Sequence, residues 1–304
     1  MPRSTLMQRA PWAKRLGTAV LLISTGGGRA SASAPRLDHV VVVIMENKSY
    51  DQVRTQTYIS SLISGGTVFA HSRAITHHSL PNYLALWSAT TIGVTTGGCP
   101  APGAPYTIEN LGHACEAAGL TWRSYAENLP SPGSAVCSAD SQLYTRRHDP
   151  WTDFSNLDHT NERPYADLPL DLAQGTLPSL AFVIPNNIDN MDDGTIDQGD
   201  AWLSRNIPAM LGALGERGML VLTWDEDDGS SANQILTVFV GTPLKGGFES
   251  EQRINHYTVV RAICEVLGIT PFAEAASQPS ITDVWSLTTP TLSSSWGRVR
   301  TIYR

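Results

Sequence analysis

Hydrophobic residues follow two patterns along this chain, and the patterns alternate. Short runs that are apolar at nearly every position predict strands buried on both faces, over residues 40–45, 180–184, 219–224 and 235–240. Apolar residues at helical spacing predict helices over residues 55–63, 108–118, 200–214 and 256–267. Shorter strand candidates span 67–70 and 120–126. The alternation predicts an α/β fold, a three-layer α/β/α sandwich around a largely parallel central sheet.

Polar residues end two of these apolar runs abruptly. Glu46 and Asn47 follow the first run, and Asp225 and Glu226 follow the run over 219–224. Sites in open α/β sheets lie at the carboxyl ends of strands, and carboxylate and amide oxygens suit a hard cation. If the two strands are neighbours, the four side chains meet on one rim and predict a metal site. The alternative is that they begin ordinary polar loops, with 227–229 as an acidic surface turn.

Ser79 stands at the start of a further helical pattern. Leu80, Leu84 and Trp87 recur at helical spacing, and Pro81 suits a first helical turn, so we expect the helix to begin just after Ser79. Serine is a common N-cap at this position. It is also a possible nucleophile, because a helix N-terminus would stabilise its phosphorylated form.

A long irregular segment, residues 128–147, leads to His148. Long loops without secondary structure in compact domains are often functional. Arg146 and Arg147 precede the histidine, so His148 is a candidate for facing a phosphate. The alternative is a solvated loop histidine.

The length of the chain predicts a single large domain, and its charge argues against one class of function. The chain has 304 residues, 41% of them hydrophobic, which is enough for a single large domain over residues 35–304. Five of its 21 basic residues and none of its 28 acidic residues lie in 1–34, so the remainder carries a formal charge of −12. An acidic chain argues against general nucleic-acid binding, which needs a basic face.

The N-terminus has the pattern of a signal peptide. Basic residues up to Arg15 precede an apolar stretch, 16–23, that is too short to span a membrane, and small residues with A-x-A sites follow up to Ala34. We therefore expect residues 1–34 to direct secretion, with an unprocessed leader as the alternative. No later stretch is long and apolar enough for a transmembrane helix.

The four cysteines show no CxxC spacing, which disfavours a zinc knuckle. An exported protein can form disulfides. Cys99 and Cys137 both lie in Gly/Pro/Ser-rich loops and are the preferred pair. Cys115 and Cys264 fall in helical patterns, where they are either buried thiols or a second bridge.

Seven segments together identify a family resemblance. In chain order they are 43–49, 78–83, 125–130, 148–151, 193–202, 223–231 and 255–257. With these segments the chain resembles the bacterial phosphoesterase family of secreted acid phosphatases and phospholipases C, in the alkaline-phosphatase superfamily. It is most similar to the short secreted acid phosphatases that act on phosphoinositides. The resemblance implies an alkaline-phosphatase-like fold.

The resemblance also implies roles for particular residues. The family's nucleophile stands two residues before Pro-Asn, which is the position of Ser79. Asn82 and His148 match phosphate-contacting positions, and His148 or, as second choice, His256 would protonate the leaving alcohol. His256 otherwise matches a substrate-binding position, and His77 matches a family histidine of less certain role.

One divalent metal ion is the implied cofactor, with Glu46, Asn47, Asp225 and Glu226 as its ligands. Oxygen ligands favour Ca²⁺, Mg²⁺ or Mn²⁺, while the nearby histidines leave Zn²⁺ or iron open. The expected partner is a phosphate-ester substrate, with a phospholipid head group as a candidate. The sequence does not give the oligomeric state.

These features predict a secreted, metal-dependent phosphomonoesterase that works through a phosphoserine intermediate. A phospholipase C-type phosphodiesterase is the near alternative, disfavoured because the long C-terminal domains of the larger phospholipases are not in this sequence. The alternative from another class is a secreted cation-binding module without catalysis.

One position departs from the family pattern. The family usually has Asp-Met-His-Asp-Gly where this chain has 190–194, so Asp192 replaces a histidine that would help to hold or protonate the phosphate. An aspartate repels a phosphate dianion unless it is protonated or binds the metal. The substitution therefore predicts either activity at lower pH or an additional metal ligand.

Overall fold

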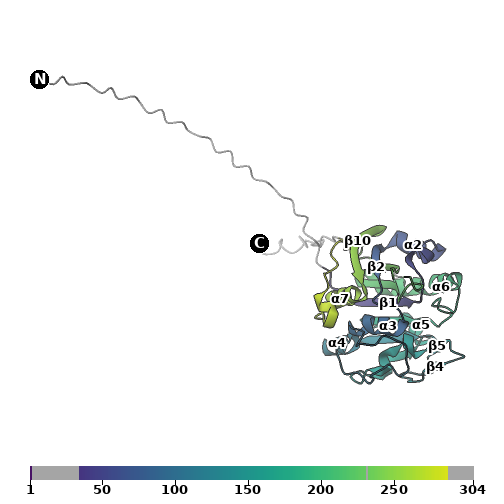
Figure 1. The fold of residues 1–304 in the computed structure, drawn as a ribbon. Helices are drawn as coiled ribbons and strands as arrows, with labels where there is room; N and C mark the ends of the chain where they lie inside the picture. The colour runs from purple at the N-terminus through teal and green to yellow at the C-terminus, as the bar shows by residue number, and fades with distance from the viewer. Residues whose placement is uncertain (2–33, 231, 287–304) are drawn as a thin grey trace, which may run out of the picture. The chain divides into compact units, whose positions relative to one another are not determined.

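A central sheet of eight strands organises the protein (Figure 1). The structure is a computed structural model that describes Met1 and residues 34–230 and 232–286; apart from Met1 and Ala34, the predicted signal peptide lies outside these residues. The strand order is β10-β2-β9-β8-β1-β7-β3-β6, and β9 alone in this sheet is antiparallel to its neighbours. The predicted α/β fold with a largely parallel sheet is confirmed. The strands are β1 (His39–Met45), β2 (Thr67–Arg73), β3 (Trp122–Ala126), β6 (Glu162–Pro164), β7 (Leu180–Ile184), β8 (Gly218–Trp224), β9 (Thr237–Val240) and β10 (Phe248–Asn255).

Helices cover both faces of the sheet, which makes three layers (Figure 1). Residues of α3 (Ser79–Ser88), α4 (Leu111–Ala117) and α7 (His256–Leu267) pack in the core of one face. Residues of α2 (Thr57–Gly65), α5 (Asp167–Gln174) and α6 (Ile196–Leu214) pack in the core of the other. In β1, Val40, Val42 and Ile44 face the first core, whereas Val41, Val43 and Met45 face the second. The run is apolar at every position because both of its faces are covered.

Shorter elements complete the description. They are α1 (Tyr50–Val53), the hairpin β4 (Ser138–Ala139) and β5 (Tyr144–Thr145), and the 3₁₀ helices η1 (Arg146–His148), η2 (Pro150–Asp153), η3 (His159–Asn161), η4 (Gly215–Arg217) and η5 (Ala273–Ser277). The 128–147 segment is thus mostly irregular, as predicted, but contains a small hairpin. None of the described helices is long and apolar enough to cross a membrane.

Several elements were not predicted, and some helices have limits that differ from the predicted ones. The pattern of β10 at the sheet edge resembles a polar loop, because charged side chains alternate with its buried residues; β6 and α5 were also missed. Helix α6 begins four residues before the predicted start, because Thr195 and Gln198 form a capping box there. Helix α4 begins late because the Asn110 side chain caps it at the His113 N–H.

Strands β1 and β8 are direct neighbours, with Met45 opposite Trp224. Because they are parallel, their carboxyl ends meet at the same edge of the sheet. The backbone N–H of Asp225 donates to the Met45 carbonyl at 2.9 Å. The residues that follow the two strands are therefore brought together on one rim, as the sequence predicted.

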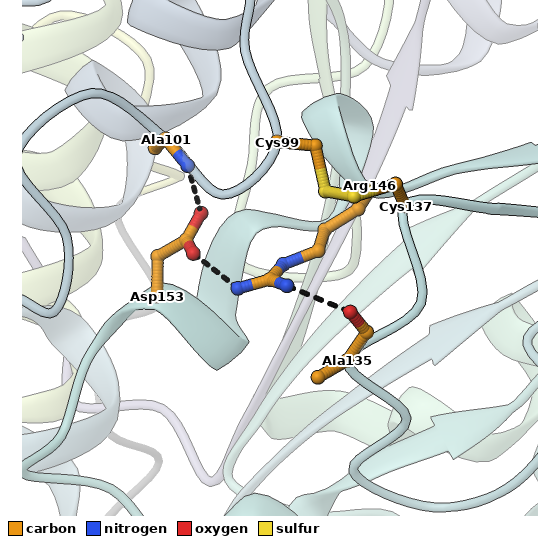
Figure 2. Close-up of a disulfide and its surroundings, with 6 residues drawn as sticks. All are labelled: Cys99, Ala101, Ala135, Cys137, Arg146 and Asp153. Carbon is orange, nitrogen blue, oxygen red and sulfur yellow. Dashed lines mark hydrogen bonds and ion pairs between the residues drawn. A yellow bond between two sulfur atoms is a disulfide. The ribbon is translucent and has the colours of Figure 1, made fainter.

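The loop that carries His148 is tied down by a disulfide and a buried ion pair (Figure 2). Cys99 and Cys137 form the predicted bridge, whereas Cys115 and Cys264 are buried free thiols. The Arg146 N–H donates to the Cys137 carbonyl at 3.0 Å, and the Arg146 guanidinium pairs with Asp153.

Candidate functional site

Four residues at the ends of β1 and β8 form what we call the strand-end wall of the site: Glu46, Asn47, Asp225 and Glu226. Glu46 is fully buried, and its Oε2 accepts a hydrogen bond of 3.0 Å from the Ser79 hydroxyl. Its Oε1 accepts a hydrogen bond from the Tyr83 hydroxyl. Burial, with the charges of Asp225 and Asp192, raises the pKa of Glu46 well above its ordinary value.

Asn47 and Asp225 each present an oxygen that has no donor. Asn47 adopts a left-handed backbone (φ +43°), and its N–H donates to Asp225 Oδ1 at 3.3 Å. The Oδ1 of Asn47 and the Oδ2 of Asp225 are buried without a hydrogen-bond partner. Burial and the charge of Glu226 raise the pKa of Asp225 to about 7. Unsatisfied buried acceptors are costly, so these oxygens fit a bound cation.

Glu226 uses only one of its oxygens within the protein. Its Oε2 accepts hydrogen bonds of 2.9 Å from His77 Nδ1 and from the His78 N–H. The second nitrogen of His77, Nε2, bonds the Ser230 carbonyl at 2.9 Å. Partial burial opposes protonation of His77, but the bonds to Glu226 and Ser230 outweigh it and raise the His77 pKa. Glu226 Oε1 accepts no hydrogen bond from a described residue and is available to a ligand.

Ser79 is the first residue of α3, and not the N-cap before it. His78 occupies the cap position, with an unusual backbone (φ +84°) and no capping side chain. Strain of this kind costs on the order of 1–3 kcal/mol and clusters at functional sites. The Ser79 hydroxyl does not cap the helix, because it donates to Glu46 and lies beside Asp225. The start of α3 thus aims Ser79 at the strand-end wall.

Asn82 shapes the loop that precedes Ser79. It is fully buried, and its Oδ1 accepts from the N–H groups of Ile75 and Thr76 at 3.1 and 3.2 Å. Its Nδ2 donates to the carbonyls of Thr76 and His78 at 2.8 and 3.1 Å. The phosphate contact predicted for Asn82 would require some of these bonds to open, and it stays a prediction.

His256 holds the backbone of the strand-end wall. Its Nε2 donates to the Asp225 carbonyl at 2.6 Å, while its Nδ1 is buried without a partner. Burial lowers the His256 pKa to about 4, so the ring is neutral near pH 7. The substrate contact predicted for His256 stays a prediction; in the structure this residue positions Asp225.

The opposite side of the site, which we call the loop wall, consists of Arg147, His148 and Asp192. Arg147 Nε donates to His148 Nε2 at 3.1 Å, and Arg147 Nη2 donates to Asp192 Oδ2 at 2.9 Å. The other oxygen of Asp192 accepts from Asn47 Nδ2 at 2.8 Å. Arg147 therefore neutralises Asp192, and Asp192 in turn fixes the amide of Asn47.

His148 is buried and is the residue of the loop wall that contacts Glu46 of the strand-end wall. Its Nε2 lies 3.5 Å from Glu46 Oε2, its Nδ1 lies 3.2 Å from the Thr145 hydroxyl, and its ring stacks on Tyr83. Burial and the Arg147 charge hold the pKa of His148 well below its ordinary value. A neutral ring with the proton on Nδ1 fits the contacts with Thr145 and Arg147, because Nδ1 then donates to the Thr145 hydroxyl and Nε2 accepts from Arg147 Nε.

A second group of possible metal ligands shares Glu46 with the predicted set. One ligand atom each from Glu46, His148 and Asp192 lies within 4.8 Å of the others. The Arg147 guanidinium already donates to two of these three residues. The strand-end wall is therefore the better cation site, because its free acceptors have no such donor.

Two residues of the site were not assigned from the sequence. Tyr83 lies four residues after Ser79, so a helical pattern places both on one face, and this spacing could have revealed it. Arg147 stood next to His148 in the sequence, but nothing in the pattern linked it to Asp192, 45 residues away.

Comparisons with known proteins show what the chain is similar to. A model of the phosphoesterase family matches residues 53–270. A phosphatidylinositol-3-phosphatase from Mycobacterium tuberculosis is 42% identical over 262 residues, which cover 85% of this chain and 86% of that protein. An acid phosphatase from Aspergillus fumigatus is 25% identical over 75% of this chain, and the match spans about half (54%) of the fungal protein.

Solved structures share the fold. A protein of the alkaline phosphatase superfamily from Vibrio parahaemolyticus superposes with a TM-score of 0.58 at 10% identity, covering 82% of this chain and 73% of that one. A lipoteichoic acid synthase from Listeria monocytogenes gives a TM-score of 0.60 at 10% identity, covering 83% and 77% of the two chains. At this level of identity the likeness concerns the fold alone.

Proposed function

The chain belongs to the phosphoesterase family and hydrolyses phosphate esters, and we propose that it is a secreted, metal-dependent phosphomonoesterase with Ser79 as its nucleophile. One observation carries this proposal. The Ser79 hydroxyl donates to the buried Glu46 carboxylate, beside the unpartnered oxygens of Asn47 and Asp225. Phosphoryl transfer through a metal-activated serine needs a nucleophile at the start of a helix, next to acceptor oxygens that a cation can bind.

Glu46, Asn47, Asp225 and Glu226 would hold the cation. The unpartnered oxygens of Asn47 and Asp225 support these two ligands. Glu46, whose oxygens accept from Ser79 and Tyr83, would bind through a remaining lone pair. An oxygen-only set favours Ca²⁺, Mg²⁺ or Mn²⁺. When bound, a divalent cation supplies the positive charge that activates a hydroxyl and neutralises phosphoryl oxygens.

Ser79 Oγ attacks phosphorus in line, so that an Oγ–P bond forms as the bond to the leaving alcohol breaks. Glu46 Oε2, which accepts the Ser79 hydrogen bond, is placed to receive the hydroxyl proton. Water then hydrolyses the phosphoserine and releases inorganic phosphate. The α3 N-terminus favours the negative charge on this intermediate.

The loop wall would face the phosphoryl group and the leaving alcohol. His148 is the predicted proton donor, but the structure holds it neutral. A phosphate dianion beside the ring would raise its pKa and so permit protonation, because a nearby negative charge favours the charged imidazolium.

Asp192 would act as a positioning residue rather than as a metal ligand. One of its oxygens is paired with the Arg147 guanidinium, whose positive charge would repel a cation, and the other accepts from Asn47 Nδ2. The bond to Asn47 Nδ2 turns the Asn47 oxygen away from Asp192 and leaves it for the cation. The pairing with Arg147 removes the repulsion that an isolated aspartate would exert on a phosphate.

Phosphoinositide monoesters are the proposed substrate class. The support is the 42% identical relative, which is a phosphatidylinositol-3-phosphatase and matches most of both chains. Secretion is supported by the signal-peptide pattern of residues 1–34 and by the Cys99–Cys137 disulfide, a bond that persists in oxidising compartments.

A substrate and metal series tests the proposed function. The chain is assayed across pH with p-nitrophenyl phosphate, p-nitrophenyl phosphorylcholine and phosphatidylinositol 3-phosphate, before and after chelation and with each divalent cation restored. We expect the two monoesters to be hydrolysed, chelation to abolish turnover, and Mg²⁺, Ca²⁺ or Mn²⁺ to restore it. Preference for the diester would establish a phospholipase C-type enzyme. Turnover that persists after chelation would refute the proposed metal dependence. No turnover under any condition would support the non-catalytic alternative.

A further inference from the structure

A cavity of about 680 Å³ opens where β2 and β10 end, within the size range of small-molecule sites. Its basic lining residues are His71, Arg73 and Arg253, and its polar lining residues include Gln234 and Asn255. This cavity is separate from the residues of the two walls, none of which lines it.

Strand register places the side chains of His71, Arg73 and Arg253 on one face of the sheet. In the parallel β2–β10 pair, Arg253 is opposite His71, and Asn255 is opposite Arg73. Because side chains alternate along a strand, His71 and Arg73 point the same way, and Arg253 points with them. Arg73 and Arg253 are thus diagonal neighbours, within reach of a shared ligand.

The two arginines lack carboxylate partners in the part of the chain that the structure describes. Arg73 donates to the Ala232 carbonyl, Arg253 makes no side-chain hydrogen bond or ion pair, and both are exposed. His71 pairs with Glu251 at 3.1 Å. Two guanidinium groups without a carboxylate partner, at diagonal positions of adjacent strands, thus offer donors to an anion, and guanidinium groups bind phosphate with paired hydrogen bonds.

The cavity is connected to the catalytic edge by two short segments. From Arg73 the chain runs through the loop that Asn82 holds, directly to Ser79. From Asn255 it continues into His256, which bonds the Asp225 carbonyl. Because β2, β10, β1 and β8 are mutually parallel, their carboxyl ends, and hence the cavity and the strand-end wall, lie at the same edge of the sheet.

We propose that this cavity, which we call the arginine cavity, binds a second phosphate group while the substrate phosphate is at Ser79. The inference rests on the proposed function, because a phosphoinositide in a membrane is surrounded by phosphate-bearing head groups. The ligand is a phosphate group, presented either by a neighbouring anionic phospholipid or by another part of the same substrate molecule. Arg73 and Arg253 would bind its oxygens.

The test compares a double variant, Arg73→Gln/Arg253→Gln, with a control of equal charge, Arg163→Gln/Arg205→Gln. The control arginines lie outside the arginine cavity; they form loose ion pairs of 3.6 and 4.0 Å, and Arg163 also donates to the Thr160 carbonyl at 3.3 Å, much as Arg73 donates to the Ala232 carbonyl. Three substrates are used: p-nitrophenyl phosphate, water-soluble short-chain phosphatidylinositol 3-phosphate, and full-length phosphatidylinositol 3-phosphate in vesicles that contain phosphatidylglycerol. Co-sedimentation with the same vesicles measures binding without catalysis.

We expect the double variant to hydrolyse p-nitrophenyl phosphate like the wild type. On vesicles we expect its kcat/KM and its binding to fall about 10- to 30-fold below the control, since each basic residue near an anionic surface contributes roughly one kcal/mol. Equal loss on the short-chain lipid would assign the ligand to the substrate's own phosphates, and loss on vesicles alone would assign it to neighbouring lipids. A double variant that matches the control in both lipid assays would overturn the proposal. If the wild type hydrolyses none of the substrates, the proposed function fails, while co-sedimentation still decides on the arginine cavity.

Discussion

The two walls of the candidate site satisfy their polar groups in opposite ways. The strand-end wall carries buried oxygens with no donor, on Asn47 and Asp225. In the loop wall, Arg147 donates to His148 and to Asp192, so charge and hydrogen bonds are balanced inside the protein. The difference supports our proposal that a cation binds at the strand-end wall, whereas the polar groups of the loop wall are satisfied by one another.

The walls also differ in what holds them in place. The strand-end wall follows directly from two adjacent parallel strands at the centre of the sheet. The loop wall depends on side-chain contacts: the Arg146–Asp153 ion pair and the Cys99–Cys137 disulfide secure the segment that carries Arg147 and His148. We therefore expect substitutions at the first wall to affect the chemistry, and substitutions around the second to affect geometry and stability as well.

The largest effect is expected at the residue that the strand-end wall orients. Ser79→Ala removes the proposed nucleophile and should lower kcat/KM for p-nitrophenyl phosphate by at least about 10³-fold, with the melting temperature little changed. Ser88→Ala, in the same helix, is the matched control, because its hydroxyl bonds only backbone carbonyls. Retained turnover in Ser79→Ala would reject the nucleophile.

Removing one charge from the strand-end wall should have the next largest effect. Asp225→Asn keeps the side-chain volume but removes a proposed ligand, so we expect activity and metal affinity to fall by about 100-fold or more, beyond the loss typical of residues that support a ligand. Metal affinity is read as the rise in melting temperature on adding Mg²⁺, Ca²⁺ or Mn²⁺. Asp228→Asn is the control, since Asp228 bonds Ser49 and Gln52 at an exposed turn. Equal behaviour of the two variants would contradict the division between the walls.

A smaller effect is expected where the walls touch, at Asp192. Asp192→Ala removes the bonds to Asn47 and Arg147 and should lower kcat/KM about 10- to 100-fold, as loss of a ligand-supporting residue does. Asp192→Asn can still accept from Asn47 and should keep most of the metal-induced rise in melting temperature. If the metal-induced rise in melting temperature is reduced equally in Asp192→Asn and Asp192→Ala, Asp192 does not act by positioning Asn47.

Asp192→His tests the two hypotheses that the sequence suggested. A shifted pH–rate profile relative to the wild type would support activity at lower pH or a role as ligand. An unchanged profile rejects both and leaves the positioning role that the hydrogen bonds support.

The sequence indicated the strand-end wall as a group, whereas it indicated His148 and Asp192 of the loop wall singly and did not indicate that Arg147 joins them. Continuous apolar runs show where buried strands end, and a parallel sheet brings such ends to one edge, so Glu46 and Asp225 could be placed together. The pairing of Arg147 with Asp192 follows from the folding of two irregular segments, and no periodic pattern encodes it. The edge strand β10, and with it the arginine cavity, was missed because its charged residues resemble a loop.

Breaking the disulfide should weaken the loop wall selectively. Cys99→Ser/Cys137→Ser releases a loop closed over 38 residues and should cost about 3–4 kcal/mol of unfolding free energy by chain-entropy arguments. Activity should fall together with the loss of order around His148, whereas metal binding at the strand-end wall should persist in the folded variant. Denaturant unfolding and metal-induced melting shifts measure the two effects separately. Loss of metal binding in folded protein would show that the walls are not independent.

The smallest effect is expected far from both walls, at Asp171. Although burial opposes it, hydrogen bonds from Tyr125 and Thr176 and the charge of Arg123 lower the Asp171 pKa. A lowered pKa means that the charged form stabilises the fold above the unfolded-state pKa near 4, and that this stability is lost as pH falls through the folded-state value. Asp171→Asn should therefore cost about 1–2 kcal/mol at pH 7 and progressively less below pH 4. Denaturant unfolding measures this difference, and a cost that is independent of pH would contradict the assignment.

The central claim, that the strand-end wall makes Ser79 a nucleophile, is tested most directly by trapping the intermediate. The wild-type protein is mixed with p-nitrophenyl phosphate, quenched in acid within the first turnover, digested and mapped by mass spectrometry. We predict a phosphate on Ser79 in the peptide that contains the start of α3, which is lost after chelation of the metal. Phosphate on another residue, or rapid turnover with no phosphorylated peptide, would contradict it.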